Sequence, residues 1–259
     1  MQKQTENKEI VGTLIKGLNV IKAFDSQHQS MTLSEVAKTL DITRASARRL
    51  LLTLESLGYV QQRHNQFSLT PKIIELGFSY FASRPWTDLA YENMKTVSQQ
   101  CKISCSTSVL DGDYIICIAR VPATQIIHEE IHVGSRLPTA YSSTGRVFMT
   151  HMPDEELRAF IDTLPLKAFT KNSIVDPNLL FEKMKAERAQ SYQMVVEELE
   201  EGMLSMAVPI YGRNQELKGA MNVGTHTGLN SPETLIKNVL PILQRAAMET
   251  TKAIKALRY

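Results

Sequence analysis

The chain has 259 residues, of which 43% are hydrophobic and 22% charged; this composition excludes a disordered protein and suggests two domains. A net charge of +2 does not by itself indicate a polyanion partner, but residues 1–85 carry a net +4 and the rest of the chain a net −2. Because no signal peptide opens the sequence and no apolar run approaches ~18 residues, we expect a cytoplasmic protein with no membrane partner.

A helix-turn-helix is predicted over residues 33–52. Thr32 and Glu35 match a capping box at the start of its first helix, in which each side chain satisfies a free backbone N–H. Asp41 occupies the turn, where Asp tolerates a positive φ better than most residues. The apolar stripe of the second helix is predicted to bury Ala47, Leu50, Leu51, Leu54 and Leu57.

The other side of that second helix is basic and polar. Arg44 and Arg48 lie four residues apart and are neighbours on the helix surface. Arginine binds guanine O6 and N7 in the major groove, and hydroxyls and helix-start amides hold phosphates. An ordinary basic, solvated face is the alternative. The residues predicted to contact DNA are Thr43, Arg44, Ala45, Ser46, Arg48, Arg49, Thr53 and Arg63.

A β-hairpin is predicted directly after the helix-turn-helix. Residues 59–63 and 66–69 alternate in polarity around the turn candidate His64-Asn65. A helix-turn-helix followed by a hairpin is a winged helix, in which Arg63 at the hairpin tip would lie near the phosphate backbone. This arrangement favours DNA binding over a merely solvated face.

Two further helices are predicted on either side of the winged helix. An apolar periodicity over residues 10–24 predicts a helix that packs beneath the helix-turn-helix. Thr70 and Pro71 begin another, with a hydroxyl cap and a proline at the first helical position. That helix is apolar on too many sides to bridge solvent alone. We therefore expect a linker helix over residues 71–85 that packs on its own domain, residues 10–70, and on a second subunit.

Residues 86–259 alternate helices and strands in a pattern typical of an α+β ligand-sensing domain, with an antiparallel sheet flanked by helices. Asp111-Gly112-Asp113 is predicted to be the turn of an antiparallel hairpin. The predicted strands cover residues 103–110, 114–121, 126–133, 192–196, 205–211 and 217–224. The predicted helices cover residues 86–100, 142–151, 154–164, 177–191 and 232–257, the last of which Pro241 can kink.

One motif suggests an enzyme. His128-Glu129-Glu130-Ile131-His132 matches H-E-x-x-H, which binds zinc only when both histidines share one helical face. The flanking β-branched residues favour a strand, where residues four apart are separated by ~13 Å and cannot share one metal. A zinc hydrolase using His128, Glu129 and His132 is thus a disfavoured rival, and no catalytic residue, metal or cofactor is predicted. Cys101, Cys105 and Cys117 are interpreted as buried free thiols.

Ser142-Ser143-Thr144-Gly145 reads as a helix start. Its hydroxyls can simply cap the helix, or its free N–H groups can hold a carboxylate. Arg136 lies six residues upstream and can add positive charge, although a surface salt bridge is the commoner fate of an arginine. The four glutamates at 197, 198, 200 and 201 are interpreted as part of a solvated loop between two strands. One of these glutamates can pair with a structural arginine.

The chain resembles the IclR family of transcriptional regulators over about residues 10–259. The N-terminal motifs are LIKGLNVIKAF, LSEVAKTLDITRASARRLLLTLESLGYV and FSLTPKIIELG; the C-terminal ones are VGSRLPTAYSSTGRVFM, EELEEGMLSMAVPIY and LKGAMNVGT. The segments SSTGR at 142–146 and NVLP at 238–241 are most similar to the PcaU/PobR/PcaR branch. Members of that branch regulate aromatic-acid breakdown and respond to protocatechuate or 4-hydroxybenzoate.

This resemblance implies a winged helix-turn-helix, a linker helix used in dimerisation, and a GAF-like effector-binding and oligomerisation domain over residues 86–259. It implies a regulator that binds double-stranded operator DNA as a dimer or a dimer of dimers. A small aromatic carboxylate would make it activate catabolic genes, with RNA polymerase as a further partner. The alternatives are a repressor of the same family that answers a non-aromatic carboxylate, and a C-terminal domain that only oligomerises.

The resemblance also places the effector pocket. Some relatives carry an acidic residue near Val195, where this chain is apolar, and an apolar wall suits an aromatic ring. Arg136 is added for its charge to the residues carried over by motif. The predicted effector-binding residues are Arg136, Ser143, Thr144, Met203, Ser205, Asn222 and Gly224.

Overall fold

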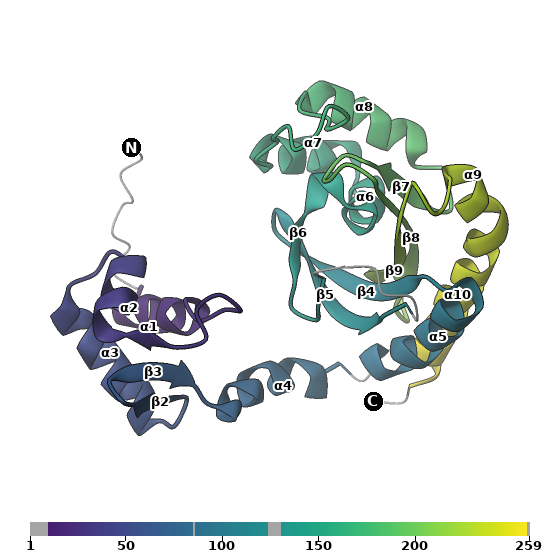
Figure 1. Ribbon diagram of the computed structural model, residues 1–259. Helices are drawn as coiled ribbons and strands as arrows, with labels where there is room; N and C mark the ends of the chain where they lie inside the picture. Colours follow the sequence, from purple (N-terminus) through teal and green to yellow (C-terminus); the bar gives the residue numbers. More distant parts are fainter. Residues whose placement is uncertain (1–9, 85, 124–130, 258–259) are drawn as a thin grey trace. The chain divides into compact units, whose positions relative to one another are not determined.

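The computed structural model describes residues 10–84, 86–123 and 131–257 (Figure 1). The chain divides into two compact units, residues 1–83 and 84–259. Helices and antiparallel strands occur in both, so the predicted α+β class is confirmed. Each unit has its own sheet.

The first unit is a winged helix, as predicted. Glu35 accepts a hydrogen bond from the Thr32 N–H at 2.7 Å, which completes the capping box at the start of α2. Asp41 has a φ of 49° in the turn. His64 and Asn65, with φ of 47° and 67°, form the turn of the wing. The elements are α1 (Gly12–Lys22), β1 (Met31–Thr32), α2 (Leu33–Thr39), α3 (Arg44–Ser56), β2 (Val60–Arg63) and β3 (Gln66–Leu69), with the sheet order β1-β3-β2.

One expectation about the core of this unit is wrong, and another is confirmed in part, because α1 does pack on the core that it shares with α3. Leu57, the C-cap residue of α3, is 52% exposed, so the buried stripe of the helix ends at Leu54. Helix α1 packs on the core only near its C-terminal end, where Val20 is fully buried. Leu14 and Ile15 remain 62% and 49% exposed on its N-terminal half.

The linker begins with a 3-10 turn, η1 (Pro71–Ile73), and continues as α4 (Ile74–Ala82). The predicted hydroxyl cap is wrong, because Thr70 Oγ1 instead donates a hydrogen bond to the Gly58 carbonyl at 2.5 Å. No residue of α4 is buried, and Ile74 and Phe78 are 69% and 66% exposed. The expected packing of this helix on its own domain is therefore not present, and its contact with a second subunit stays a prediction.

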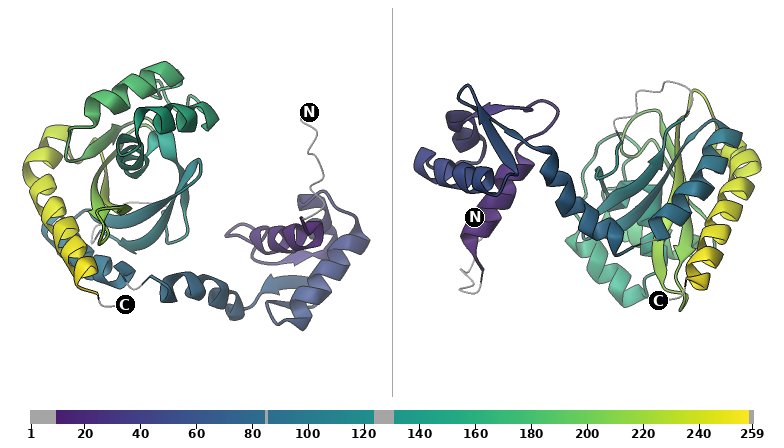
Figure 2. Two further views of the ribbon diagram at one scale, coloured as in Figure 1. Left: turned by 180° about the vertical axis from the view of Figure 1, so that it is seen from behind. Right: turned by 90° about the horizontal axis from the view of Figure 1, so that it is seen from below.

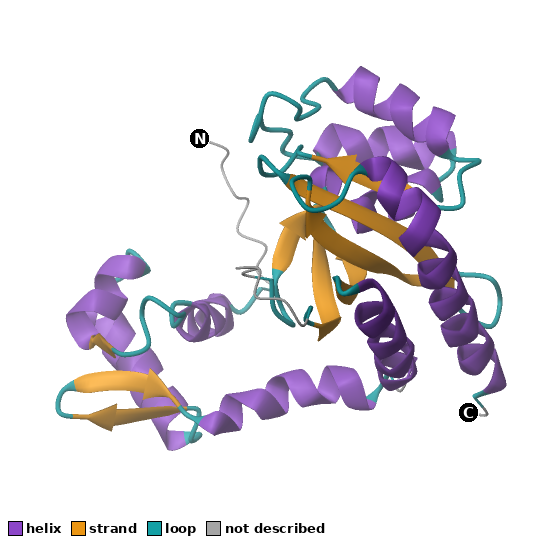
Figure 3. Cartoon of the chain, turned by 45° about the vertical axis from the view of Figure 1, so that its right-hand side comes forward, coloured by secondary structure: helices purple, strands orange, loops and turns teal. Residues whose placement is uncertain are grey.

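The second unit is a curled six-stranded antiparallel sheet with helices on both faces (Figures 2 and 3). Helices α5 and α10 pack together along one face, and α6 lies on the other, with α7 and α8 beyond it. The strands, in the order β6-β5-β4-β9-β8-β7, are β6 (Arg136–Pro138), β5 (Tyr114–Val121), β4 (Ser104–Asp111), β9 (Leu217–His226), β8 (Met203–Tyr211) and β7 (Gln193–Val196). The helices are α5 (Trp86–Cys101), η2 (Thr139–Tyr141), α6 (Ser143–Thr150), α7 (Asp154–Thr163), α8 (Pro177–Glu187), α9 (Pro232–Thr234), η3 (Leu235–Val239) and α10 (Leu240–Ala256).

Two local expectations about this unit need correction, and the expected irregularity of the closing helix near Pro241 is present. The strand predicted over 126–133 begins outside the described residues, and 131–133 are not in a strand; the edge strand is β6 instead. Helix α8 ends at Glu187 rather than at Ser191. The closing helix is interrupted by the π-helical segment η3 just before Pro241, whose missing N–H removes a helical hydrogen bond there.

Candidate functional site

The outward face of α3 carries the predicted DNA contacts. Thr43 Oγ1 accepts a hydrogen bond from the Ser46 N–H at 3.2 Å, so the helix begins at Arg44 as its cap predicts. Thr53 Oγ1 donates a hydrogen bond to the Arg49 carbonyl at 2.8 Å. Its single proton is used in this way, so the hydroxyl oxygen can only accept a hydrogen bond from another molecule. Ser46 is half-buried. The other predicted contacts are all exposed: Thr43, Arg44, Ala45, Arg48, Arg49, Thr53 and, on β2, Arg63.

The charge of this face is not compensated within the described part of the chain. The structure records no ion pair there for Arg44, Arg48 or Arg49. Leu52, which the apolar pattern did not single out, is 39% exposed on this side of the helix. An exposed helix face with three arginines suits the phosphate backbone and the base edges of DNA.

The second unit contains a cavity of about 860 Å³ on the α6 side of its sheet. Helix α6 rests on the small side chains Ala207 and Ala220 through Val147. Because side chains alternate along strands, Ser205 and Asn222 face the same side as those alanines, beyond the helix. The sheet therefore continues past α6 as the floor of the cavity. All seven predicted effector residues line it: Arg136, Ser143, Thr144, Met203, Ser205, Asn222 and Gly224.

The start of α6 forms one wall of the cavity. Ser142 caps the helix by accepting a hydrogen bond from the Gly145 N–H at 2.9 Å, and the Ser143 and Thr144 side chains are buried behind it. A Cβ on Gly145 would lie 2.0 Å from the Thr139 carbonyl oxygen, so only glycine lets the helix start approach η2 this closely. The predicted helix-start turn is thus held tightly at the cavity edge.

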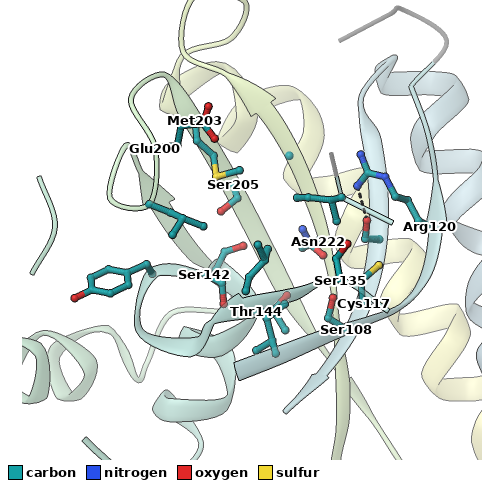
Figure 4. Close-up of a pocket in the computed structure, with 18 of the residues that line it drawn as sticks. Ser108, Cys117, Arg120, Ser135, Ser142, Thr144, Glu200, Met203, Ser205 and Asn222 are labelled. Carbon is teal, nitrogen blue, oxygen red and sulfur yellow. Dashed lines mark hydrogen bonds between the residues drawn. The ribbon is translucent and has the colours of Figure 1, made fainter. Parts of the chain in front are cut away.

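The sequence reasoning missed an arginine inside the cavity. Arg120 on β5 is half-buried and donates a hydrogen bond from Nη1 to Ser106 Oγ at 2.9 Å (Figure 4). Burial lowers the pKa of Arg120, but a guanidinium stays charged at neutral pH. Ser106 and Ser108 on β4 also line the cavity. Serines at alternate positions of one strand were a signal that could have located this floor.

Arg120 reaches the cavity because of a β-bulge. The register pairs Thr107 with Ala119 but Ser108 with Cys117, which leaves Ile118 as an extra residue on β5. An extra residue shifts the alternation of side chains by one position. Cys117 and Arg120 are three residues apart, yet both line the cavity.

Arg136, the arginine that the sequence suggested, lies at the rim in a different setting. Its Nη1 is 3.0 Å from Asp111 Oδ2, and its guanidinium lies 4.6 Å from the centre of the Tyr114 ring. Its side chain is 47% exposed. The surface salt bridge considered as the commoner fate is therefore present, although Arg136 also lines the cavity.

A buried ion pair fixes the opposite wall. Arg146 of α6 donates a hydrogen bond from Nη2 to Glu198 Oε2 at 2.5 Å, and the two side chains are 1% and 9% exposed. One of the four glutamates thus pairs with a structural arginine, as expected. Leu199 and Glu200, which follow Glu198, line the cavity.

The residues of the rival zinc site are only partly described. His128 and Glu129 lie outside the described residues; His132 is described, and its backbone N–H donates to Ser135 Oγ at 2.8 Å. Within the described ranges there is no group of three side chains that could hold a metal ion, and no helix is long and apolar enough to cross a membrane.

The cysteines are free, and burial raises the pKa of the Cys105 and Cys117 thiols.

Two family models match the two units. The model of the IclR helix-turn-helix domain matches residues 13–64, and that of the bacterial transcriptional regulator IclR C-terminal region matches residues 78–251. The chain belongs to the IclR family of bacterial transcriptional regulators. Membership of this family implies DNA binding through the helix-turn-helix.

Individual relatives and solved structures show which members of the family this chain is similar to. The chain is 35% identical over 250 residues to the Pca regulon regulatory protein of Pseudomonas putida, covering 96% of this chain and 86% of that protein. A crystal structure described as a transcriptional regulator from Rhodococcus sp. RHA1 matches with a TM-score of 0.86 and 37% identity, covering 96% of this chain and all of that one. The inducer-binding domain of PobR from Acinetobacter, a double mutant in complex with 3-hydroxybenzoic acid, matches with a TM-score of 0.60 and 28% identity, covering 64% of this chain and 97% of that one.

These relatives are regulators of transcription, which is not an enzyme class. The predicted membership of the aromatic-acid branch agrees with the similarity to the Pca regulon protein. The zinc-hydrolase rival has no counterpart among them.

Proposed function

We propose that this IclR-family regulator binds a small aromatic carboxylate in the cavity of its second unit and thereby activates aromatic-acid catabolic genes. The cavity is the observation that carries the proposal, because it brings all seven predicted effector residues to one place. The similarity to the Pca regulon protein and to an inducer-binding domain that holds 3-hydroxybenzoic acid supports the ligand class.

The chemistry of the cavity suits a hydroxylated benzoate. Apolar side chains such as Ile115, Leu137 and Leu199 can pack on an aromatic ring. The hydroxyl groups of Ser106, Ser108 and the other serines can bond ring hydroxyls, while positive charge is available for a carboxylate. The many polar groups of the lining can orient the ligand, while the apolar side chains add affinity by packing on its ring.

The regulatory step follows from two conformations of the assembled protein. A dimer, or a dimer of dimers, would place two α3 helices in successive major grooves ~34 Å apart on a palindromic operator. An effector that binds one arrangement of the dimer more tightly shifts the population toward it. In the activating arrangement the bound protein recruits RNA polymerase to the neighbouring promoter.

A thermal-shift screen of the purified protein tests the ligand class. We expect protocatechuate, 3-hydroxybenzoate or 4-hydroxybenzoate to raise Tm in a dose-dependent manner, because a ligand specific for the native state stabilises it. Small aliphatic carboxylates serve as the comparison. A shift with aliphatic acids alone would favour the repressor that answers a non-aromatic carboxylate. The absence of any shift would leave a C-terminal domain that only oligomerises.

A further inference from the structure

We propose that Ala45 and Leu52 on α3 read the C5-methyl groups of two thymines in each half-site of the operator. These contacts are independent of the effector proposed above, because they concern only the DNA that the helix-turn-helix selects. A protein reads a DNA sequence through groups that touch the base edges, since contacts to phosphates carry no sequence information by themselves. The outward face of α3 offers apolar as well as basic groups for this purpose.

Ala45 and Leu52 lie on one line along the outward face of α3. They are seven residues apart, which is nearly two turns of an α-helix, so their side chains point in the same direction. Both residues are exposed, Leu52 to 39%. The buried residues occupy the opposite side of the helix: Ala47, Leu50, Leu51 and Leu54. The two apolar side chains therefore stand at the centre of the face that a DNA groove would meet.

Two arginines lie between these side chains. Arg48 and Arg49 are each three or four residues from both Ala45 and Leu52, which is the spacing of neighbours on a helix surface. Arginine binds O6 and N7 of guanine, while apolar side chains contact the methyl group of thymine. Ala45 and Leu52 are ~10.5 Å apart along the helix axis, about the length of three base-pair steps. The face thus fits a guanine with a thymine on either side.

The surroundings of Leu52 favour DNA over a protein partner. The exposed apolar residues of α1 and α4 lie beside others of their kind, whereas Leu52 is flanked by Arg48 and Arg49. A protein that covered Leu52 would also have to bury two arginine charges, which costs free energy unless each charge is paired. In a major groove, phosphates and guanine acceptors interact favourably with the same charges.

Replacing thymine by uracil tests the assignment, because uracil lacks only the C5-methyl group. The full-length protein first selects duplexes from a random-sequence library, with and without 4-hydroxybenzoate. Each thymine of the selected site is then replaced in turn by uracil, and binding is measured by fluorescence anisotropy. We expect two thymines in each half-site, about three base pairs apart, whose replacement weakens binding about fourfold, the effect of burying one methyl-sized group.

Variants of the two residues connect each thymine to its reader. Leu52→Ala should remove the effect of uracil at one of the two positions, and Ala45→Gly should remove it at the other, because the shortened side chain no longer reaches the methyl group. Leu57→Ala is the matched control. Leu57 is 52% exposed at the C-cap of the same helix, but it follows Leu52 by five residues and so points to another side. This control should keep both effects of uracil.

Several results would overturn the assignment. Selection of no common sequence, or equal binding of thymine and uracil duplexes at every position, rules out methyl reading by α3. An effect of uracil that persists in both variants shows that other residues read the thymines. A smaller mass of Leu52→Ala in light scattering, with both uracil effects intact, places Leu52 in a subunit contact instead. Should Ala45→Gly fail to fold by circular dichroism, Ala45→Ser decides, since its hydroxyl should abolish the same thymine preference and an unchanged preference excludes Ala45.

Discussion

At the scale of single residues, the buried pair of Arg146 and Glu198 links the helix start that lines the cavity to the loop on its other side. Both side chains are almost fully removed from water, at 1% and 9% exposed. Two charges in such a place are stable only together, because each alone would keep its desolvation cost without compensation. The pair therefore holds α6 and the segment after β7 at a fixed separation.

Replacing Glu198 with Gln is expected to lower the free energy of unfolding by about 3–5 kcal/mol, because it leaves the Arg146 charge buried and unpaired. Chemical denaturation followed by the fluorescence of Trp86 measures this change. Glu249→Gln is the control, since Glu249 pairs with Lys252 at the surface and should cost less than about 1 kcal/mol. Equal effects of the two variants would contradict the structural role of the buried pair.

At the scale of elements, local signals predicted the winged helix well. The capping box at Thr32, the positive φ of Asp41 and the cap at Thr43 each depend on residues within four positions along the chain. Two other expectations depend on how the chain packs beyond those windows: Leu57 is exposed rather than buried, and residues 131–133, the described end of the strand expected over 126–133, are not in a strand.

The candidate effector site was predicted less completely. Its motif residues Ser143, Thr144, Met203 and Asn222 do line the cavity. Arg120 was missed because its direction is set by how β5 pairs with β4 and not by the polarity of its neighbours in sequence.

The exposed face of α3 leads to a prediction about DNA. Arg48→Ala or Arg49→Ala should weaken operator binding, and loss of a phosphate contact should reduce the salt dependence of log K by about 1. Fluorescence anisotropy with an operator duplex at several salt concentrations measures both quantities, while thermal shift with a hydroxybenzoate should be unaltered. Lys171→Ala, an exposed lysine of the second unit, is the control. Unchanged DNA affinity in both arginine variants would show that α3 does not read the operator through this face.

At the scale of the whole molecule, each chain exposes several apolar side chains along two helices of its first unit. Leu14 and Ile15 on α1 are 62% and 49% exposed, and Ile74 and Phe78 on α4 are 69% and 66% exposed. Exposed apolar groups gathered on two helices indicate a protein interface. We therefore expect the chain to self-associate through the helices of its first unit.

Phe78→Ser should shift the protein from a dimer toward a monomer, because it removes apolar surface from the expected interface. Light scattering over a range of concentrations measures the mass. The same variant should lose affinity for a palindromic operator more than for an isolated half-site. Leu179→Ser is a matched control, since Leu179 on α8 is 65% exposed in the second unit. An unchanged mass for Phe78→Ser would place the subunit contact elsewhere.

The extra residue on β5 has a consequence for how this protein can vary. A substitution at Arg120 changes the side chain at that position. Only the loss or gain of a residue near Ile118 changes the face of the sheet to which the side chain at position 120 points. Deleting Ile118 would turn Arg120 toward α5, where Thr107 donates a hydrogen bond to Met94 and the side chains are buried. A charge there would have to be compensated within the core. The side chains that β5 presents to the cavity are thus set by chain length at one position as well as by residue type.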